Sequence, residues 1–595
     1  AASLWLSTLA EKCESGEIIY DLRIKENHAA DEHKSHLLLV PSGELQRTVA
    51  DDAQHTLPNF RQGDAIVLYE RNADTDNVTN KMVFKGNIDY LNENEICIRL
   101  RATQQNSSVL PSDSLYAIEH DAMDTTFRSM YQGLYAFMSA TKERRDLLLF
   151  QREPQFDVAL DKQIAEAADD FTRIALKAKA AKDYFLLVGP PGTGKTSCAL
   201  KKMVETFYKE EGAQILLLSY TNRAVDEICK ALSSIRPEVD FIRVGSELSC
   251  DENYRDHLIE NELATCMRRT EVCERINRCR ILVGTVASIS GKPELFRLKH
   301  FDVAIVDEAT QILEPQLLGI LCAKGENGKE GVGKFILIGD HKQLPAVVLQ
   351  NTEQSEVYDE ALSAVGLKNL KDSLFERLYR TARQHTDAHR TYDMLCRQGR
   401  MHPEVALFAN QAFYEGRLLP VGLPHQLEDS GNINRLSFYP SQPEPMGSSA
   451  KTNHSEAKIA ARLAATVYKE HSEAFDASRT LGIITPYRSQ IALVKKEIEA
   501  LGIPELNQIL IDTVERFQGS ERDVIIYSFC VNYPYQLKFL SNLTEEDGIL
   551  IDRKLNVALT RARKQMLLTG VPTLLERNPL YKSLLKLIES LRNIA

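Results

Sequence analysis

The fold of this chain is decided by the stretch Tyr184-Phe185-Leu186-Leu187-Val188-Gly189-Pro190-Pro191-Gly192-Thr193-Gly194-Lys195-Thr196. Five apolar residues lead into the pattern GxxxxGK(S/T), and the helix-forming stretch 197–208 follows directly. A strand, a glycine-rich turn and a helix in this order form a loop whose backbone N–H groups surround phosphates at a helix N-terminus. A glycine-rich turn with another purpose would not need the Lys-Thr pair, so the sequence predicts a nucleoside triphosphate site.

Each part of this loop has an expected task. The glycines let the backbone curl around the phosphates, Lys195 places its charge on the β- and γ-phosphates, and the Thr196 hydroxyl binds Mg²⁺. The residues of the loop that we predict to bind ATP are Gly189, Gly192, Thr193, Gly194, Lys195 and Thr196.

A pair of carboxylates ends a second apolar run. Residues 301–308, FDVAIVDE, place Asp307 and Glu308 where a buried strand would stop. Asp307 is predicted to hold Mg²⁺ through water, and Glu308 is predicted to polarise the water that attacks the γ-phosphate. Two adjacent acids in a solvated loop are the alternative, which the four apolar residues directly before Asp307 disfavour.

Short apolar runs alternate with helical segments from residue 184 onward. The expected strands of a first series are 184–188, 214–220, 280–285, 301–306 and 334–338, and those of a second series are 480–487, 508–512, 522–529 and 565–571. Continuous apolar strands separated by helices indicate parallel sheets that are covered on both faces. We therefore expect an α/β fold with one domain at 183–385 and another at 386–595.

The residues before 183 follow two other patterns. Residues 1–126 contain short, partly alternating runs at 64–70, 81–90 and 95–101, which predict a small β-barrel or sandwich. Residues 127–182 are predicted to be helical and to carry one apolar stripe at helical spacing. The stripe consists of Phe127, Met130, Tyr131, Leu134 and Met138.

Length and composition exclude several classes of protein. A chain of 595 residues exceeds the ~250–300 residues of a single hydrophobic core, so two or more domains are expected. No run approaches the ~20 apolar residues of a membrane span, and the first residues lack the pattern of a secretory leader.

Eleven cysteines without a CxxC pair indicate scattered thiols in a reducing, intracellular compartment. A zinc or iron–sulfur site is the alternative for the densest group, although its spacing matches no zinc pattern; that group is Cys250, Cys266, Cys273 and Cys279.

The distribution of charge matters more than its sum. A net charge of −11, from 72 Lys and Arg against 83 Asp and Glu, disfavours a nucleic-acid partner when it is taken as a whole. Residues 1–150 carry 15 basic and 23 acidic side chains, a balance of −8, whereas the other 445 residues carry 57 and 60, a balance of −3. The nearly neutral remainder can still present a basic channel. The acidic N-terminal region is either a solvated protein face or a surface for a protein partner or a gate.

Nine further sequence blocks follow the loop in a fixed order. They are TNRAVD (221–226), VGT (283–285), DEATQ (307–311), GDHKQLP (339–345), QGRMHP (398–403), FYEG (413–416), TPYRSQ (485–490), QGSERD (518–523) and LNVALTRAR (555–563). In this order the blocks resemble the superfamily 1 helicases of group B. The resemblance is strongest to the branch that holds the nonsense-mediated-decay RNA helicase and the Okazaki-fragment nuclease–helicase.

The resemblance implies a fold and a set of residue roles. It implies two tandem RecA-like domains with parallel sheets, an N-terminal β-barrel accessory domain and a helical stalk. It further implies that Gln343 senses the γ-phosphate and that Arg400 and Arg561 reach it as arginine fingers from the second domain. The residues that it assigns to the base and the ribose are Gln163, Gly519 and Glu521. Those that it assigns to single-stranded DNA or RNA are Thr221, Asn222, Thr285, Thr485, Pro486 and Arg488.

The chain departs from the family pattern at Gly399. The family usually carries Tyr at this place, and the resemblance implies that its ring stacks on the adenine. Gly399 offers no ring, so the preference for one nucleotide is expected to be relaxed. The guanidinium plane of Arg397 is an alternative cover for the base.

The leading hypothesis from the sequence is an ATP-dependent helicase or translocase that moves 5′→3′ on single strands, where the polarity comes from the resemblance alone. An ATP-switched clamp or scaffold subunit without processive unwinding is the alternative. A P-loop kinase is disfavoured because it explains neither the second α/β domain nor the arginines of that domain.

Overall fold

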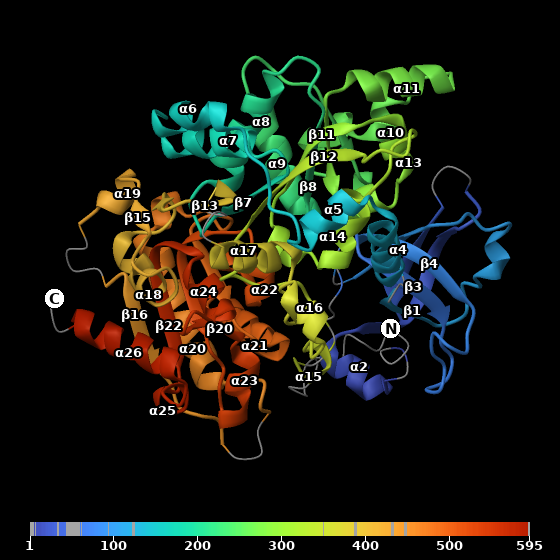
Figure 1. Cartoon of the computed structure of the whole chain (residues 1–595). Coiled ribbons are helices and arrows are strands. Elements are labelled where there is room, and N and C mark those ends of the chain that lie inside the picture. Colours follow the sequence, from blue (N-terminus) through green and yellow to red (C-terminus); the bar gives the residue numbers. More distant parts are fainter. Residues whose placement is uncertain are drawn as a thin grey trace. The chain divides into compact units, whose positions relative to one another are not determined.

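The computed structural model describes residues 5, 7–31, 35–42, 60, 62–92, 94–121, 125–348, 350, 352–385, 390–429, 434–445 and 449–592 of the 595-residue chain. The chain divides into two compact units, Ala1–Thr125 and Thr126–Ala595 (Figure 1). Within the described ranges, no helix has both the length and the apolar character that crossing a membrane requires.

The first unit is a closed β-barrel, drawn in blue in Figure 1. Its antiparallel strands are, in their order around the barrel, β1 (Ile18–His28), β2 (His36–Pro41), β5 (Ile96–Leu100), β4 (Val83–Leu91), β3 (Ala65–Glu70) and β6 (Tyr116–His120). Of the two predicted forms, barrel and sandwich, the chain therefore adopts the barrel. Inward-facing apolar residues such as Ile66, Ile88 and Ile98 fill its interior. A buried ion pair between Lys12 and Glu119, 2.9 Å from Nζ to Oε1, holds helix α2 (Leu9–Ser15) on the barrel.

In the described residues, a series of helices lies in sequence between the last barrel strand and the first sheet of the second unit. They are α4 (Thr125–Ser139), α5 (Lys142–Leu148), α6 (Asp161–Ala165) and α7 (Asp170–Ala180). Helix α4 packs through Gly133, where a Cβ would overlap the carbonyl oxygen of Pro315 in α14 (Glu314–Leu321). Only glycine permits so close an approach of two backbones. Much of the predicted apolar stripe therefore lies away from this contact; its exposed members are Phe127, Tyr131, Leu134 and Met138.

The first sheet of this unit has seven parallel strands. In spatial order they are β13 (Tyr392–Met394), β7 (Tyr184–Val188), β12 (Val332–Gly339), β11 (Phe301–Val306), β8 (Ile215–Ser219), β10 (Ile281–Thr285) and β9 (Phe241–Val244). The sequence predicted the central five. It also placed a domain boundary at 385, whereas the edge strand β13 lies beyond 385 and pairs with β7 of the first sheet. β13 is a half-buried edge strand of three residues without an apolar run, so it gave no signal.

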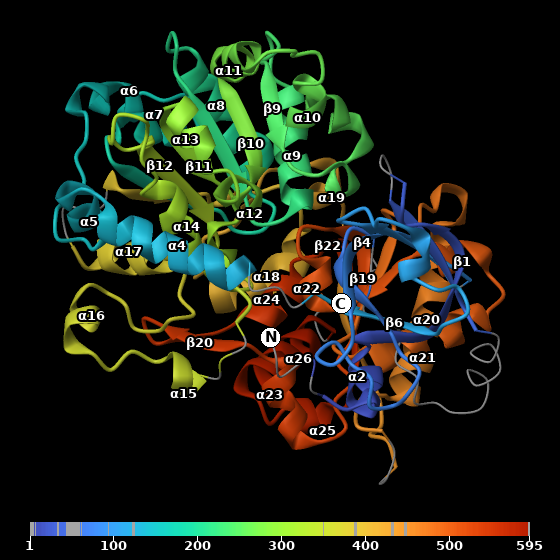
Figure 2. The same ribbon diagram turned by 90° about the vertical axis from the view of Figure 1, so that its right-hand side faces the viewer.

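Helices cover both faces of the first sheet (Figure 2). On one face lie α7, α8 (Lys201–Tyr208) and α9 (Asn222–Ser233). On the other lie α5, α12 (Val286–Ser290), α13 (Glu294–Leu298), α14 and α17 (Leu374–Gln384). Further helices of this half are α10 (Ile259–Glu262), α11 (Arg269–Arg278), α15 (Thr352–Ser355) and α16 (Glu360–Ala364).

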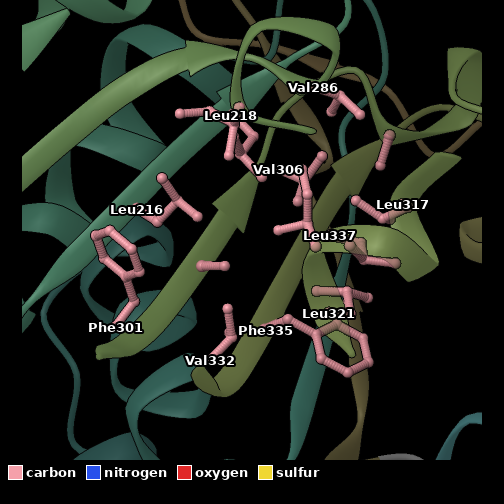
Figure 3. Packing of buried hydrophobic residues seen from close by; sticks show 14 of the residues in the cluster. Leu216, Leu218, Val286, Phe301, Val306, Leu317, Leu321, Val332, Phe335 and Leu337 are labelled. Carbon is pink, nitrogen blue, oxygen red and sulfur yellow. The ribbon is translucent and has the colours of Figure 1, made fainter. Parts of the chain in front are cut away.

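Burial on both faces explains the uninterrupted apolar strands. Along β7, Leu186 and Val188 face one core and Phe185 and Leu187 face the other. Figure 3 shows the first core, where side chains of β8, β11 and β12 meet two leucines of α14. The labelled residues that make this contact include Leu216, Leu218, Val306, Leu337, Leu317 and Leu321. Residues after these parallel strands consequently gather at one edge of the sheet.

The second sheet has five parallel strands. They are β16 (Leu436–Pro440), β22 (Ala562–Gly570), β19 (Arg522–Ser528), β17 (Leu481–Ile484) and β18 (Leu510–Asp512), and β16 is the strand that the sequence did not predict. Two short ribbons accompany it, β14 (Arg397–Gln398) with β15 (Leu419–Pro420), and β20 (Leu543–Glu546) with β21 (Ile549–Asp552). The helices of this half are α18 (Pro403–Phe413), α19 (Pro424–Leu427), α20 (His454–Glu470), α21 (Arg488–Glu499), α22 (Val514–Phe517), α23 (Leu537–Leu540), α24 (Arg553–Leu559), α25 (Pro572–Leu575) and α26 (Pro579–Arg592).

Candidate nucleotide site between two α/β domains

The predicted phosphate loop follows β7 at the carboxyl edge of the first sheet. Gly189 N–H donates to the Gly339 carbonyl across 2.9 Å, which ties the start of the loop to the neighbouring strand β12. Gly192 and Gly194 have φ of 74° and 75°, in the left-handed region that glycine adopts at no steric cost. The buried Thr193 hydroxyl donates to the Pro190 carbonyl at 2.7 Å. A helical turn then begins at Lys195 and continues into α8.

The predicted metal ligands are neighbours in the structure. Asp307 follows β11, is almost fully buried, and accepts a hydrogen bond from the Thr196 hydroxyl. Burial and then the charge of Glu308 raise the pKa of the Asp307 carboxyl. Among the described residues, no group of three His, Cys, Asp or Glu side chains could hold a metal. One hydroxyl and one carboxylate nevertheless fit Mg²⁺, which is usually bound by one or two carboxylates together with substrate phosphates and waters.

Lys195 is held by the second predicted acid. Its ammonium lies 3.2 Å from Glu308 Oε1 and also donates to the Gly189 carbonyl at 3.5 Å. Burial alone would raise the pKa of Glu308, but the charge and hydrogen bond of Lys195 and the amide of Gln311 lower it. The carboxylate is thus kept ionised beside the loop, with Lys195 as its counter-charge.

Arg561 reaches the site from the second sheet. Its NH2 donates to Gln343 Oε1 at 3.1 Å, and Gln343 in turn donates to Asp340 Oδ2 at 2.7 Å. The Nε of Arg561 donates to the Val557 carbonyl at 2.9 Å, which orients the guanidinium. Burial and then the charge of Arg400 lower the pKa of Arg561 to about 9. Within the part of the chain that the structure describes, no carboxylate forms an ion pair with Arg561, so this buried cation is poised to take a further negative charge.

Arg400 lies directly on the phosphate loop. The N–H of Gly399 donates to the Gly192 carbonyl at 2.8 Å, and a Cβ on Gly192 would overlap the Cβ of Arg400. The Nε of Arg400 donates to Glu521 Oε2 at 2.5 Å. Burial would raise the pKa of Glu521, but Arg400 and Arg563 lower it. Glu521 therefore orients an arginine in this arrangement.

The remaining nucleotide residues are less tightly grouped. Gln163 is exposed on α6, which packs against α7. Gly519 has φ of 78° in the turn that leads to Glu521, with open space around its Cα. Their assignment to the base and ribose stays a prediction.

The predicted nucleic-acid residues form two sets, one on each sheet. Thr221 follows β8 and Thr285 ends the paired strand β10, and each caps a helix by accepting a backbone N–H, at 3.2 and 3.0 Å. Asn222 is the first residue of α9. In the second domain, Thr485 and Pro486 lead from β17 to Arg488, the first residue of α21. Thr485 is fully buried, so its hydroxyl is not presented at the surface.

A buried polar cluster links the two domains beside the site, and the sequence did not single it out. The hydroxyl of Tyr414 donates to Asp340 Oδ2 at 2.7 Å and accepts from Asn556 Nδ2 at 2.8 Å. Asn556 Nδ2 also donates to the Lys342 carbonyl at 2.6 Å. A polar Asn inside the apolar run LNVAL was the available signal, because buried polar groups require partners.

Two protein-family models match this chain, and both are described as "AAA domain". One matches residues 166–272 and 261–351, and the other matches residues 370–573. Together they cover both sheets that contribute to the site.

Curated relatives are DNA helicases by name. The chain is 26% identical over 645 residues to the "DNA replication ATP-dependent helicase/nuclease DNA2" of Bos taurus, covering 99% of this chain and 54% of that protein. It is 27% identical over 535 residues to the "DNA replication ATP-dependent helicase/nuclease JHS1" of Arabidopsis thaliana, covering 83% and 36%. It is 26% identical over 482 residues to the "DNA polymerase alpha-associated DNA helicase A" of Saccharomyces cerevisiae, covering 69% and 65%. The chain thus spans about half the length of its mammalian relatives.

Among solved structures, the chain is similar to the Arterivirus nonstructural protein 10 helicase, at 14% identity and a TM-score of 0.34 over 92% of this chain and 78% of that one. A likeness at this level carries no argument about fold or ligand. The family models and the curated relatives agree with the order of the sequence blocks and with two parallel-sheet domains that meet at a P-loop. These comparisons support a superfamily 1 helicase of the branch that holds the nonsense-mediated-decay RNA helicase and the Okazaki-fragment nuclease–helicase.

Proposed function

We propose that this protein is a nucleic-acid-dependent ATPase that moves 5′→3′ along single-stranded DNA and separates strands. The observation that carries the proposal is the pair of contacts that join the two domains at the phosphate loop. They are the Arg561–Gln343 hydrogen bond at 3.1 Å and the Gly399–Gly192 hydrogen bond at 2.8 Å. Because the second domain completes the site, hydrolysis in it depends on domain closure.

The residues of the first domain would bind and activate the triphosphate. Thr196 and Asp307 would hold Mg²⁺, which would supply positive charge to neutralise the phosphates. Lys195 would leave Glu308 for the phosphates, since a triphosphate carries more negative charge than one carboxylate. Glu308 would then be free to orient and polarise the attacking water.

The arginines of the second domain would supply the remaining charge stabilisation. Phosphoryl transfer has a loose transition state, so catalysis rests on positioning and on neutralising charge. Arg561 and Arg400 belong to the second domain, so they would reach the loop only while the domains touch. An arginine finger is worth ~10³–10⁵ in rate, which makes closure the controlling event.

Closure would also produce movement along the strand. Thr221 and Thr285 sit at the carboxyl edge of the first sheet, and Arg488 sits at that of the second. Opening and closing the domains would shift these two grips relative to each other. Contacts of this kind go to the phosphate backbone, so binding should tolerate any sequence and weaken with salt.

Single-stranded DNA is proposed as the track because the names of the relatives specify DNA. The eleven unpaired cysteines support a reducing, intracellular compartment. For the acidic N-terminal region, a surface for a protein partner or a gate stays a proposal of the charge distribution.

The test is ATP hydrolysis with matched single-stranded DNA and RNA oligonucleotides of one sequence. We expect DNA to stimulate hydrolysis strongly in the original protein. We expect no stimulation in Lys195→Ala, because this variant lacks the positive charge that would bind the phosphates. A hydrolysis rate that no nucleic acid raises, or that Lys195→Ala leaves unchanged, contradicts the proposal. Strand displacement on duplexes with a 5′ or a 3′ single-stranded tail then separates a motor from the clamp, because a clamp hydrolyses ATP without displacing either strand.

A further inference from the structure

Leu423 occupies the space beside Gly399 where the family usually has an aromatic side chain. A Cβ built on Gly399 would lie 3.2 Å from Leu423 Cδ1 and 3.8 Å from Val421 Cγ2. Gly399 does not have a left-handed backbone, so its conformation would accept a side chain. Position 399 thus lacks the aromatic ring, and the side chain of Leu423, from a different segment, lies beside it.

The backbone holds this segment in place. β15 pairs in parallel with β14, and the N–H of Val421 extends the pairing to the Gln398 carbonyl at 3.1 Å. The amide of the buried Gln426 donates to the carbonyls of Gln398 and Met401, both at 2.9 Å. Leu423, between these two anchors, is therefore fixed relative to Gly399.

The surface lies next to the phosphate loop and remains open. Gly399 donates to Gly192 of the loop at 2.8 Å, so its neighbours border the place where a bound nucleotide would extend. Leu423 is 41% exposed and Val421 is 51% exposed. Arg397, on the same ribbon, lies 3.9 Å from Asp170 and is also largely exposed. Two half-exposed aliphatic residues therefore form a small apolar surface at the rim of a polar site.

We propose that Leu423, with Val421 beside it, is the face on which the base of the bound nucleotide rests. The inference rests on the proposed ATP site and adds the residues that contact the base. The base is the apolar part of a nucleoside triphosphate, and its flat face would cover the leucine once the phosphates are in the loop. Arg397 then lies at the edge of this face, with Asp170 as its partner.

This surface selects by area and not by hydrogen bonds. Leucine and valine side chains have no donors or acceptors, so they do not separate adenine from guanine. A purine covers more of the surface than a pyrimidine does, and the contact energy grows with the area removed from water. Purine nucleotides of either kind are therefore expected to bind better than pyrimidine nucleotides.

The experiment measures binding without hydrolysis, by calorimetry with ADP, CDP and inorganic tripolyphosphate, each with Mg²⁺. Leu423→Ala should weaken ADP binding about five- to tenfold, CDP binding less, and tripolyphosphate binding not at all, because tripolyphosphate has no base. The matched control is Leu501→Ala, which removes a leucine of similar exposure, 36%, after the end of α21. It should leave all three affinities unchanged.

A second variant tests whether an aromatic ring at position 399 can replace the leucine side chain. Gly399→Tyr combined with Leu423→Ala places a ring where the leucine was, and it should restore ADP affinity to within about twofold of the original. The inference is overturned if Leu423→Ala equals Leu501→Ala, if it weakens tripolyphosphate as much as ADP, or if the double variant stays as weak as Leu423→Ala. Failure of the original protein to bind either ADP or tripolyphosphate would instead refute the proposed function.

Discussion

Arg561 donates a hydrogen bond to Gln343 across 3.1 Å, from the second α/β domain to the first. Gln343 passes the contact to Asp340, which follows strand β12 and accepts from both Gln343 and Tyr414. A side chain that would bind the γ-phosphate is therefore joined to the residues that hold the domains together. The proposed chemistry and the proposed domain closure thus share one hydrogen-bonded path.

Arg561→Gln should lower kcat for ATP about 10³-fold while ADP affinity changes little. Glutamine can still donate to Gln343 but carries no charge, and an arginine finger acts on the transition state more than on the bound nucleotide. Steady-state ATPase kinetics with saturating single-stranded DNA measure the effect. Arg435→Gln removes another buried arginine of the same domain and should keep kcat. A kcat within threefold of the original in Arg561→Gln would refute the finger role.

Tyr414→Phe should lower the free energy of unfolding by about 1–3 kcal/mol. The change removes the hydroxyl that Asp340 and Asn556 share, and it leaves one buried carboxylate oxygen with fewer donors. Urea unfolding followed by circular dichroism gives the difference. Tyr135→Phe, on the exposed face of α4, is the matched control and should change nothing. Equal stability of the two variants would mean that the cluster does not hold the domains together.

Features that lie within one short stretch of the chain could be predicted from the sequence. Features that depend on contacts between distant segments could not. The loop 189–196 and the acids Asp307 and Glu308 are short blocks whose chemistry is complete within a few residues. The central strands were predictable because burial on both faces makes them uniformly apolar. The edge strand β13 and the contact of Leu423 with Gly399 depend on partners that lie far away in the chain, or on pairing alone. The face that α4 buries was hidden for the same reason, since Gly133 shows no apolar signal.

Gly192→Ala should lower ATPase activity at least about 10²-fold, for a reason that goes beyond backbone strain. The new Cβ would meet Arg400 Cβ and lie 3.1 Å from its backbone nitrogen, so the second domain could not close on the loop. Gly212→Ala separates the two causes, because Gly212 has a similar φ of 77° but open space around it. That variant should lose about 1–2 kcal/mol of stability and keep its activity. Equal activity in both variants would show that closure does not require this contact.

The pH dependence of stability should contain a signal from Glu456. This carboxyl is fully buried and accepts hydrogen bonds from Ser528 Oγ at 2.7 Å and from the N–H of Cys530 at 2.8 Å, yet burial raises its pKa from 4.5 to about 7. Between these two values the folded chain holds a proton that the unfolded chain has released. The contribution of Glu456 to the free energy of unfolding should therefore fall as pH rises from about 4.5 to about 7, and this loss is complete above pH 7. Glu456→Gln, which never ionises, should gain stability relative to the original protein across this window, by on the order of 1–3 kcal/mol. Urea unfolding at pH 5, 6, 7 and 8 measures this gain, with Glu473→Gln as the exposed control. A difference between Glu456→Gln and the original protein that stays constant from pH 5 to pH 8 would show that Glu456 is ionised in the fold throughout.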